Sequence, residues 1–170
     1  MVSLTTGCAA SSVRTLGPPG TKVPQVTGQN LHRERVRFPE DITGRPTLLL
    51  IAFRRHQQRD IDTWLRRIEE LRRAAPDLNV LELPVLSRSY VVMRPYIDGG
   101  MRSGIPDPEA RARTITLYTN KKSFRKALGL GTEDRVYAVL ADREGTILQV
   151  EEGPATERSF EDILKACVGT

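Results

Sequence analysis

The stretch from Pro46 to Ala75 constrains the fold most, because it joins an apolar run, a polar loop and an amphipathic helix. Residues 48–53 (LLLIAF) have strand length and no polar member, which is typical of a central strand buried on both faces, although a buried helix segment can look the same. In the following stretch, the apolar residues recur at helical spacing: Ile61, Trp64, Leu65, Ile68 and Leu71. Asp60 or Asp62 is expected to cap this helix, and Pro76 to end it.

The composition is that of a globular domain, with 39% hydrophobic and 28% charged residues among 170. The net charge of +5 comes mainly from arginine, whose excess over lysine is typical of a GC-rich bacterial source. The charge is dispersed, since residues 114–130 carry +4 and residues 131–153 carry −4. A nucleic-acid surface needs a basic stripe with exposed aromatic residues, which the sequence lacks, so no nucleic-acid partner is expected.

Cysteine and histidine are too sparse for a metal centre. The two cysteines, Cys8 and Cys167, lie at opposite ends of the chain, and only His32 and His56 could join them as ligands. We therefore expect neither a metal site nor a cofactor. Cys167 follows the apolar spacing of the last helix, which indicates a small buried core residue.

Residues 1–30 are interpreted as a leader remnant and flexible linker, and residues 31–170 as the folded domain. Small residues around Cys8 resemble the end of a bacterial lipoprotein signal peptide, although Thr5 stands where an aliphatic residue is usual and only seven residues precede the cysteine. Cys8 is thus a candidate lipidation site, with a cysteine in a disordered tail as the alternative. The lipoprotein interpretation predicts a bacterial cell-envelope location, and the alternative is the cytoplasm. A misplaced start codon is one explanation for the short stretch before Cys8, and the sequence does not settle whether the start lies upstream of Met1.

The rest of the chain alternates strands and helices. Strands are expected within 31–38, at 79–86, 114–118, 136–141 and 146–150, and helices after Asn120 and over 156–168. Residues 87–113 are predicted to be irregular: a short helix broken by glycines, of the kind that forms lids or binding surfaces. This order predicts an α/β fold with a parallel core and an antiparallel terminal hairpin.

The element order, with the strings LLLIAF and VYAVLADREGTILQVEEG, resembles the thioredoxin-like superfamily over about residues 31–168. The turn from Ala141 to Ile147 is similar to the I-D-R-D-G-x-I turn of peroxiredoxins. The resemblance implies a three-layer α/β/α sandwich with a mixed sheet and terminal β-hairpin. The strings ITLY and FRKALG are further similar to mitochondrial ATP-synthase assembly factors and their bacterial relatives.

The departures from that superfamily bear on function. Redox members carry a cysteine in the loop after the central strand, whereas residues 54–59 here read RRHQQR. The superfamily's cis-proline would fall near Val136, and no proline occurs between Pro108 and Pro154. Thiol–disulfide exchange needs a thiolate, so we do not expect redox chemistry.

Two groups of residues are candidate ligand-binding sites. The first is Arg54, Arg55, His56 and Arg59, at the start of a helix, where the backbone already favours an anion. The second, in the irregular segment, is Arg94, Tyr96, Asp98 and Arg102. The alternative is that these arginines are surface residues paired with nearby carboxylates. No catalytic residue is assigned.

Three functions remain open. The favoured one is a catalytically inert binding or assembly module with a protein partner, tethered to a membrane through Cys8. The others are an enzyme or binding protein for a small anion, and a degenerate redox protein that borrows a partner's thiol. A pocket lined by Arg54, His56 and Arg94 would favour the anion, and an exposed apolar patch between Tyr90 and Met101 would favour the binding module.

Overall fold

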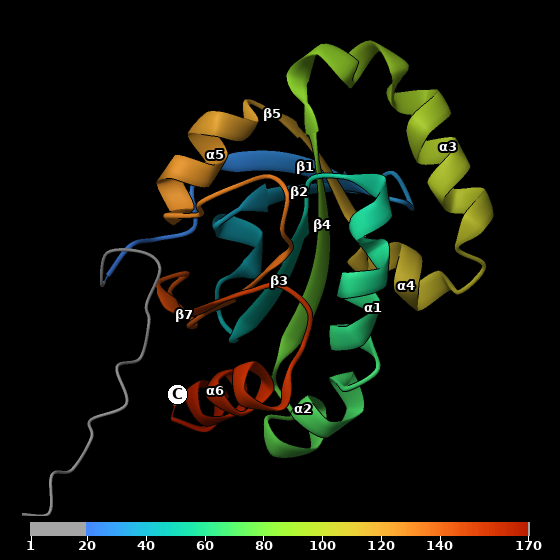
Figure 1. Cartoon of the computed structure of the whole chain (residues 1–170). Coiled ribbons are helices and arrows are strands. Elements are labelled where there is room, and N and C mark those ends of the chain that lie inside the picture. Colours follow the sequence, from blue (N-terminus) through green and yellow to red (C-terminus); the bar gives the residue numbers. More distant parts are fainter. Residues whose placement is uncertain (1–19, 170) are drawn as a thin grey trace, which may run out of the picture.

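Seven strands form one mixed sheet in the computed structural model, which describes residues 20–169 (Figure 1). The strands are β1 (Val26–Asn30), β2 (Arg35–Phe38), β3 (Thr47–Ala52), β4 (Asn79–Ser87), β5 (Ile115–Thr119), β6 (Tyr137–Ala141) and β7 (Ile147–Glu152). Their order across the sheet is β2-β1-β5-β4-β3-β6-β7. The three central strands β3, β4 and β5 are parallel, and an antiparallel hairpin flanks them on each side.

Helices cover both faces of this sheet. They are α1 (Gln58–Leu65), α2 (Ile68–Ala74), α3 (Arg94–Gly104), α4 (Pro108–Arg113), α5 (Lys121–Leu128) and α6 (Glu157–Val168), with 3-10 turns η1 (Glu40–Ile42), η2 (Arg55–Gln57) and η3 (Arg88–Met93). The arrangement is the predicted three-layer α/β/α sandwich with a mixed sheet and terminal hairpin.

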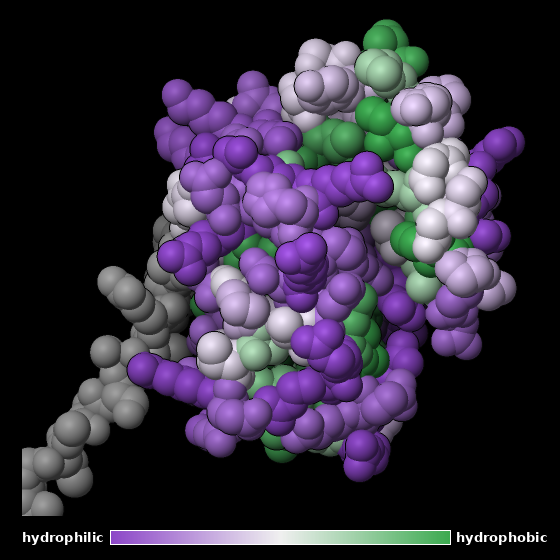
Figure 2. Space-filling model, turned by 45° about the vertical axis from the view of Figure 1, so that its right-hand side comes forward, coloured by the Kyte–Doolittle hydropathy of each residue, from purple (hydrophilic) through white to green (hydrophobic). Residues whose placement is uncertain are grey.

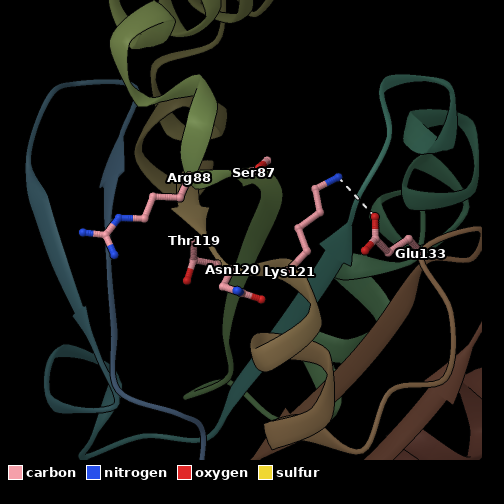
Figure 3. A pocket seen from close by; sticks show the side chains of 6 residues that line it. All are labelled: Ser87, Arg88, Thr119, Asn120, Lys121 and Glu133. Atoms are coloured by element: carbon pink, nitrogen blue, oxygen red, sulfur yellow. Dashed lines mark hydrogen bonds and ion pairs between the residues drawn. The ribbon is translucent and has the colours of Figure 1, made fainter.

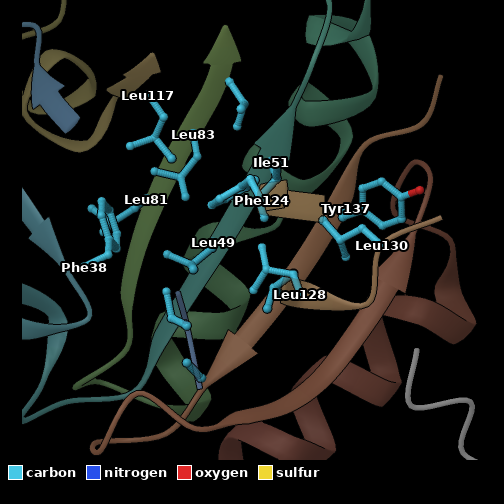
Figure 4. Close-up of a cluster of buried hydrophobic side chains, with 14 of the residues drawn as sticks. Phe38, Leu49, Ile51, Leu81, Leu83, Leu117, Phe124, Leu128, Leu130 and Tyr137 are labelled. Carbon is cyan, nitrogen blue, oxygen red and sulfur yellow. The ribbon is translucent and has the colours of Figure 1, made fainter. Parts of the chain in front are cut away.

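The central strand β3 supplies side chains to both cores, as its uninterrupted apolar run predicts. Leu49 and Ile51 join the core under α5, where Phe124 and Leu128 pack against them (Figure 4). Leu48 and Leu50 point to the opposite face and join the core built with Trp64 of α1 and Phe160 of α6. Successive strand residues face opposite sides, so a strand between two helical layers must be apolar throughout.

The helix predicted after the central loop differs from expectation in two ways. It is divided into α1 and α2, and between them Arg67 places its guanidinium 3.4 Å from the ring centroid of Phe160 in α6. The predicted capping by Asp60 or Asp62 is wrong. The turn η2 precedes the helix, and the N-cap position of α1 belongs to Gln57.

The folded unit also begins earlier than predicted, because β1 lies within the region interpreted as a linker. It pairs with β2 on one side and with β5 on the other. A Cβ atom on Gly28 would stand 2.5 Å from Cγ2 of Ile115, so the close approach of these strands needs glycine. The strand predicted within residues 31–38 is present as β2, after a turn, but it is the second strand of the chain rather than the first.

The segment 87–113 is helical rather than irregular. The turn η3 leads directly into α3, which continues through Gly99 and Gly100, and the chain leaves the helix only near Ile105. The predictions for the C-terminal part are confirmed. Asn120 caps α5 by accepting from the amide of Ser123, and α6 starts at its cap Thr156.

Candidate functional site

The loop after β3 is closed by the buried side chain of Gln57. Its carbonyl oxygen accepts from the backbone amides of Phe53, at 2.8 Å, and Arg54, at 3.0 Å. Its amide nitrogen donates to the backbone oxygen of Glu133, 2.8 Å away in the loop before β6. One buried side chain therefore joins the two loops that meet above the carboxyl end of β3.

Charged residues add further connections between the same loops. Arg54 forms an ion pair of 2.7 Å with Asp134, and Lys121 places its Nζ 3.0 Å from the oxygen of Phe53. The same Nζ is 3.4 Å from Oε2 of Glu133. In the redox proteins that this chain resembles, a thiolate stands in the first of these loops. In this chain that loop contains no cysteine, and hydrogen bonds and ion pairs hold it in place.

A polar hollow of about 450 Å³ opens beside these loops, at the carboxyl ends of β4 and β5. Its lining residues are Ser87, Arg88, Thr119, Asn120, Lys121 and Glu133 (Figure 3). Figure 3 shows the Lys121 amine directed to Glu133, whereas the Arg88 guanidinium points to the other side. In open parallel sheets, ligands bind at this end of the strands.

The arginine loop only partly matches its predicted role. Arg55, His56 and Arg59 are exposed and form no ion pair among residues 20–169, so their side chains are accessible to a ligand. Arg54 is committed to Asp134. Neither this polar hollow nor a second hollow at the opposite end of the sheet is lined by Arg54, His56 or Arg94.

The second predicted group is mainly engaged with the protein itself. Asp98 is buried, and its carboxylate accepts from the hydroxyls of Tyr118, at 2.9 Å, and Thr116, at 3.2 Å. Burial, together with the Asp98 hydrogen bond, raises the pKa of Tyr118. The guanidinium of Arg94 lies 4.6 Å from the Tyr118 ring centroid.

Arg102 also turns inward, donating from Nε to the backbone oxygen of Leu31 at 2.8 Å. Three of the four predicted residues thus fasten α3 to the β1–β5 side of the sheet. Tyr96, the fourth, is 80% exposed.

The outer side of η3 and the start of α3 carry an exposed apolar patch. It consists of Tyr90, Val91, Val92, Met93 and Tyr96, which we call the η3–α3 patch. Figure 2 shows hydrophobic side chains gathered at this end of the molecule. Val92 and Tyr96 are 82% and 80% exposed, so the patch is presented to solvent rather than to the core. Patches of this kind mark interaction surfaces.

Cys167 lies in the α6 core, as predicted. Burial raises the pKa of its thiol to about 11, so little thiolate is present at neutral pH. Within residues 20–169 no three side chains of the His, Cys, Asp or Glu type stand together as a metal site, and no helix there is long and apolar enough to span a bilayer. Cys8 lies outside the described residues.

The residues that sequence reasoning missed come from separate strand ends. Gln57 looked like one more polar loop residue, and Ser87, Thr119 and Lys121 gave no local signal. The ends of neighbouring parallel strands meet at one edge of the sheet, and this rule could have pointed to residues 87 and 119 together.

The fold is that of the thioredoxin-like α/β proteins. No protein-family model and no curated protein sequence matches the chain. Among solved structures, a putative electron transport protein from Aquifex aeolicus VF5 aligns with a TM-score of 0.62 at 15% identity, over 90% of this chain and all of its own. The exposed lipoprotein thioredoxin Etrx1 of Streptococcus pneumoniae aligns with a TM-score of 0.57 at 14% identity, over 84% and 98%.

BsSco, a member of the Sco family of cytochrome c oxidase assembly proteins, aligns with a TM-score of 0.58 at 13% identity, over 91% of this chain and 98% of its own. At these identities the likeness establishes the fold alone.

Proposed function

We propose that this chain is a thioredoxin-like binding or assembly module that works without thiol–disulfide chemistry and docks a partner protein through the η3–α3 patch. The patch is the observation that carries the proposal. It holds five of the six exposed large hydrophobic residues in the described part of the chain; the sixth, Val168, lies on α6. Clustered tyrosine, valine and methionine side chains are what a protein interface needs at its centre.

The absence of redox chemistry is supported by the loop after β3. Residues 54–59 contain no cysteine, and the buried Cys167 is a poor nucleophile because burial raises its thiol pKa. An insulin-reduction assay tests this part: the chain is expected to give the rate of the reductant alone. A rate above that background would contradict it.

The resemblance to ATP-synthase assembly factors and the fold shared with a cytochrome c oxidase assembly protein favour a subunit of a membrane complex as the partner. A tether through Cys8 would keep the module at the membrane, and Etrx1, described as an exposed lipoprotein, has the same fold. Intact-mass measurement of the membrane fraction tests the tether. A species that begins at Cys8 and carries a diacylglyceryl group is expected, and an unmodified chain would exclude it.

Site-specific photo-crosslinking tests the docking surface in cells that express the full chain. A photoreactive residue in place of Tyr96 is expected to capture one dominant protein, whereas the same residue in place of Val168 captures none. The double change Val92→Ser and Met93→Ser, with the probe still at position 96, should reduce the crosslinked product about tenfold. Equal crosslinking from positions 96 and 168 would contradict the proposal.

A second candidate, binding of a small anion at the carboxyl edge of the sheet, has its own supporting observation. Arg55, Arg59 and Arg88 form no ion pair among residues 20–169, and Arg88 lines the polar hollow. Titration with inorganic phosphate, followed by amide chemical shifts, tests it. Shifts at residues 87–88 and 119–121 that Arg88→Gln abolishes would support this candidate, and their absence would exclude it.

A further inference from the structure

A second hollow lies at the opposite end of the sheet, where β3 and β4 begin. It has a volume of about 460 Å³. Its walls come from β2, η1, α2, α4 and the starts of β4 and β5, and include Arg35, Asp41, Arg45, Arg72, Val80, Leu81, Glu109, Ala112, Arg113 and Ile115. The hollow is therefore separate from the loops around Gln57 and from the η3–α3 patch.

The hollow lies where β4 extends beyond the start of β5, because the chain before β5 is the helix α4. β4 pairs with β3 from its first residue, but its ladder with β5 starts only at Val85, after an isolated bridge at Glu82. The amide of Asn79 donates to the oxygen of Pro46 on the β3 side. Because backbone groups alternate along a strand between parallel neighbours, the N–H and C=O of Val80 point the other way, to the side where the described residues supply no strand.

Positive charge surrounds this unpaired edge. Arg72 forms an ion pair of 3.2 Å with Glu69, and Arg113 forms one of 3.0 Å with Glu82. Neither carboxylate lines the hollow. Arg35 and Arg45 form no ion pair in the part of the chain that the structure describes, although both line the hollow.

The acidic residues do not cancel this charge. Asp41 is already paired with Arg37 at 3.0 Å, which leaves Glu109 as the carboxylate of the wall without an ion pair among residues 20–169. Below the arginines, the buried side chains of Leu81 and Ile115 form an apolar floor. A matching ligand is an anion with a short apolar group.

We propose that this hollow binds a carboxylate that carries a short aliphatic side group, as a peptide C-terminus or a free branched-chain acid does. The planar guanidinium groups of Arg35 and Arg45 suit a carboxylate, which accepts two parallel hydrogen bonds from such a group. The aliphatic group covers Leu81 and Ile115, and the free carbonyl of Val80 accepts an N–H where the ligand has one. The site is independent of the proposed function.

Amide chemical-shift titration of the full chain tests the proposal with N-acetyl-L-leucine as the probe. We expect saturable shifts at Val80, Leu81 and Ile115 with a dissociation constant in the millimolar range. N-acetyl-L-leucinamide, which has no negative charge, should bind at least about tenfold more weakly. Absence of shifts at these residues, or equal binding of the amide, would overturn the proposal.

Two substitutions in the hollow and one control outside it test whether N-acetyl-L-leucine binds at this site. Arg45→Gln, at an exposed position, should weaken N-acetyl-L-leucine about tenfold, and Ala112→Glu should do the same by adding a negative charge to the wall. Arg66→Gln, an exposed arginine outside the hollow, should leave binding unchanged. Equal affinity of all three variants would overturn the proposal. Comparison with isovalerate separates the two sources: weaker binding of isovalerate indicates a peptide C-terminus, and equal binding a free acid.

Discussion

Gln57 closes the loop after β3 by hydrogen bonds, at the place where redox members of this fold carry a reactive cysteine. The residue is 2% exposed, and its side chain uses both its oxygen and its nitrogen in hydrogen bonds that hold Phe53, Arg54 and Glu133 in one arrangement. At the scale of one residue, a single buried amide side chain therefore holds the loop after β3 against the loop before β6.

Gln57→Ala should consequently lower the free energy of unfolding by about 2–3 kcal/mol, because it leaves the buried amide of Phe53 and the partly buried amide of Arg54 and carbonyl of Glu133 without this partner. Urea denaturation measures the change. The exposed neighbour Arg59→Ala serves as the control and should stay within about 0.5 kcal/mol of the parent chain. Equal effects of the two substitutions would show that Gln57 does not hold the loop.

Asp98 has a corresponding role beneath the docking patch. Asp98→Ala should cost about 1–3 kcal/mol, since it leaves the hydroxyl of Tyr118 without its acceptor, while the hydroxyl of Thr116 keeps only the backbone oxygen of Gln29. Hydrogen exchange should then accelerate in α3 more than in α6. Ser103→Ala, at an exposed position of the same helix, is the matched control and should change neither quantity appreciably. If α3 and α6 lost protection equally, Asp98 would support the whole domain rather than one helix.

At the scale of elements, the parts with local signals could be predicted from the sequence. The helices α5 and α6 carry their own caps, and the β6–β7 hairpin carries its own turn residues, with Gly145 at φ +76°. The loop after β3 could be located because the apolar run before it is long. These signals lie within a few residues of one another and need no tertiary context.

The elements that were missed depend on distant contacts. β1 reads as linker because its central residue is a glycine, and that glycine is explained only by Ile115 and Leu117 on the neighbouring strand. Gly99 and Gly100 looked like helix breaks, but α3 tolerates them because its inner side is anchored by Asp98 and Arg102. The hollow at the carboxyl edge joins residues 87–88, 119–121 and 133, which are brought together only by the parallel sheet.

A matched pair of glycine substitutions tests this account of the elements. Gly28→Ala should lower the free energy of unfolding by about 1–3 kcal/mol, because the added Cβ meets Ile115 and Leu117 at 2.5 Å and 2.7 Å. Gly100→Ala should raise it by about 0.5–1 kcal/mol, since nothing lies within 4 Å of the new methyl group and the residue is helical. Thermal and urea unfolding measure both changes, and a stabilising Gly28→Ala would contradict the tight β1–β5 contact.

At the scale of the whole molecule, Glu82 links stability to pH. Burial of the Glu82 side chain on β4 raises the pKa of its carboxyl, while Arg113, 3.0 Å away, opposes the rise. Asp62 adds to the rise as a second negative charge. The folded state therefore holds the Glu82 proton more tightly than the unfolded state does, and the associated stability is present below the unfolded pKa and is lost as the pH rises through the folded one.

Glu82→Gln keeps an oxygen that can accept from Arg113 but removes the titration. The free energy of unfolding of the parent chain minus that of the variant should therefore fall as the pH rises from about 4 to about 7. The contribution of Asp41, whose pKa is lowered by Arg37 and which does not interact with Glu82, cancels in the difference. Urea denaturation of both proteins across this range measures it. A difference that rose with pH would mean that the attraction of Arg113 outweighs the burial of Glu82.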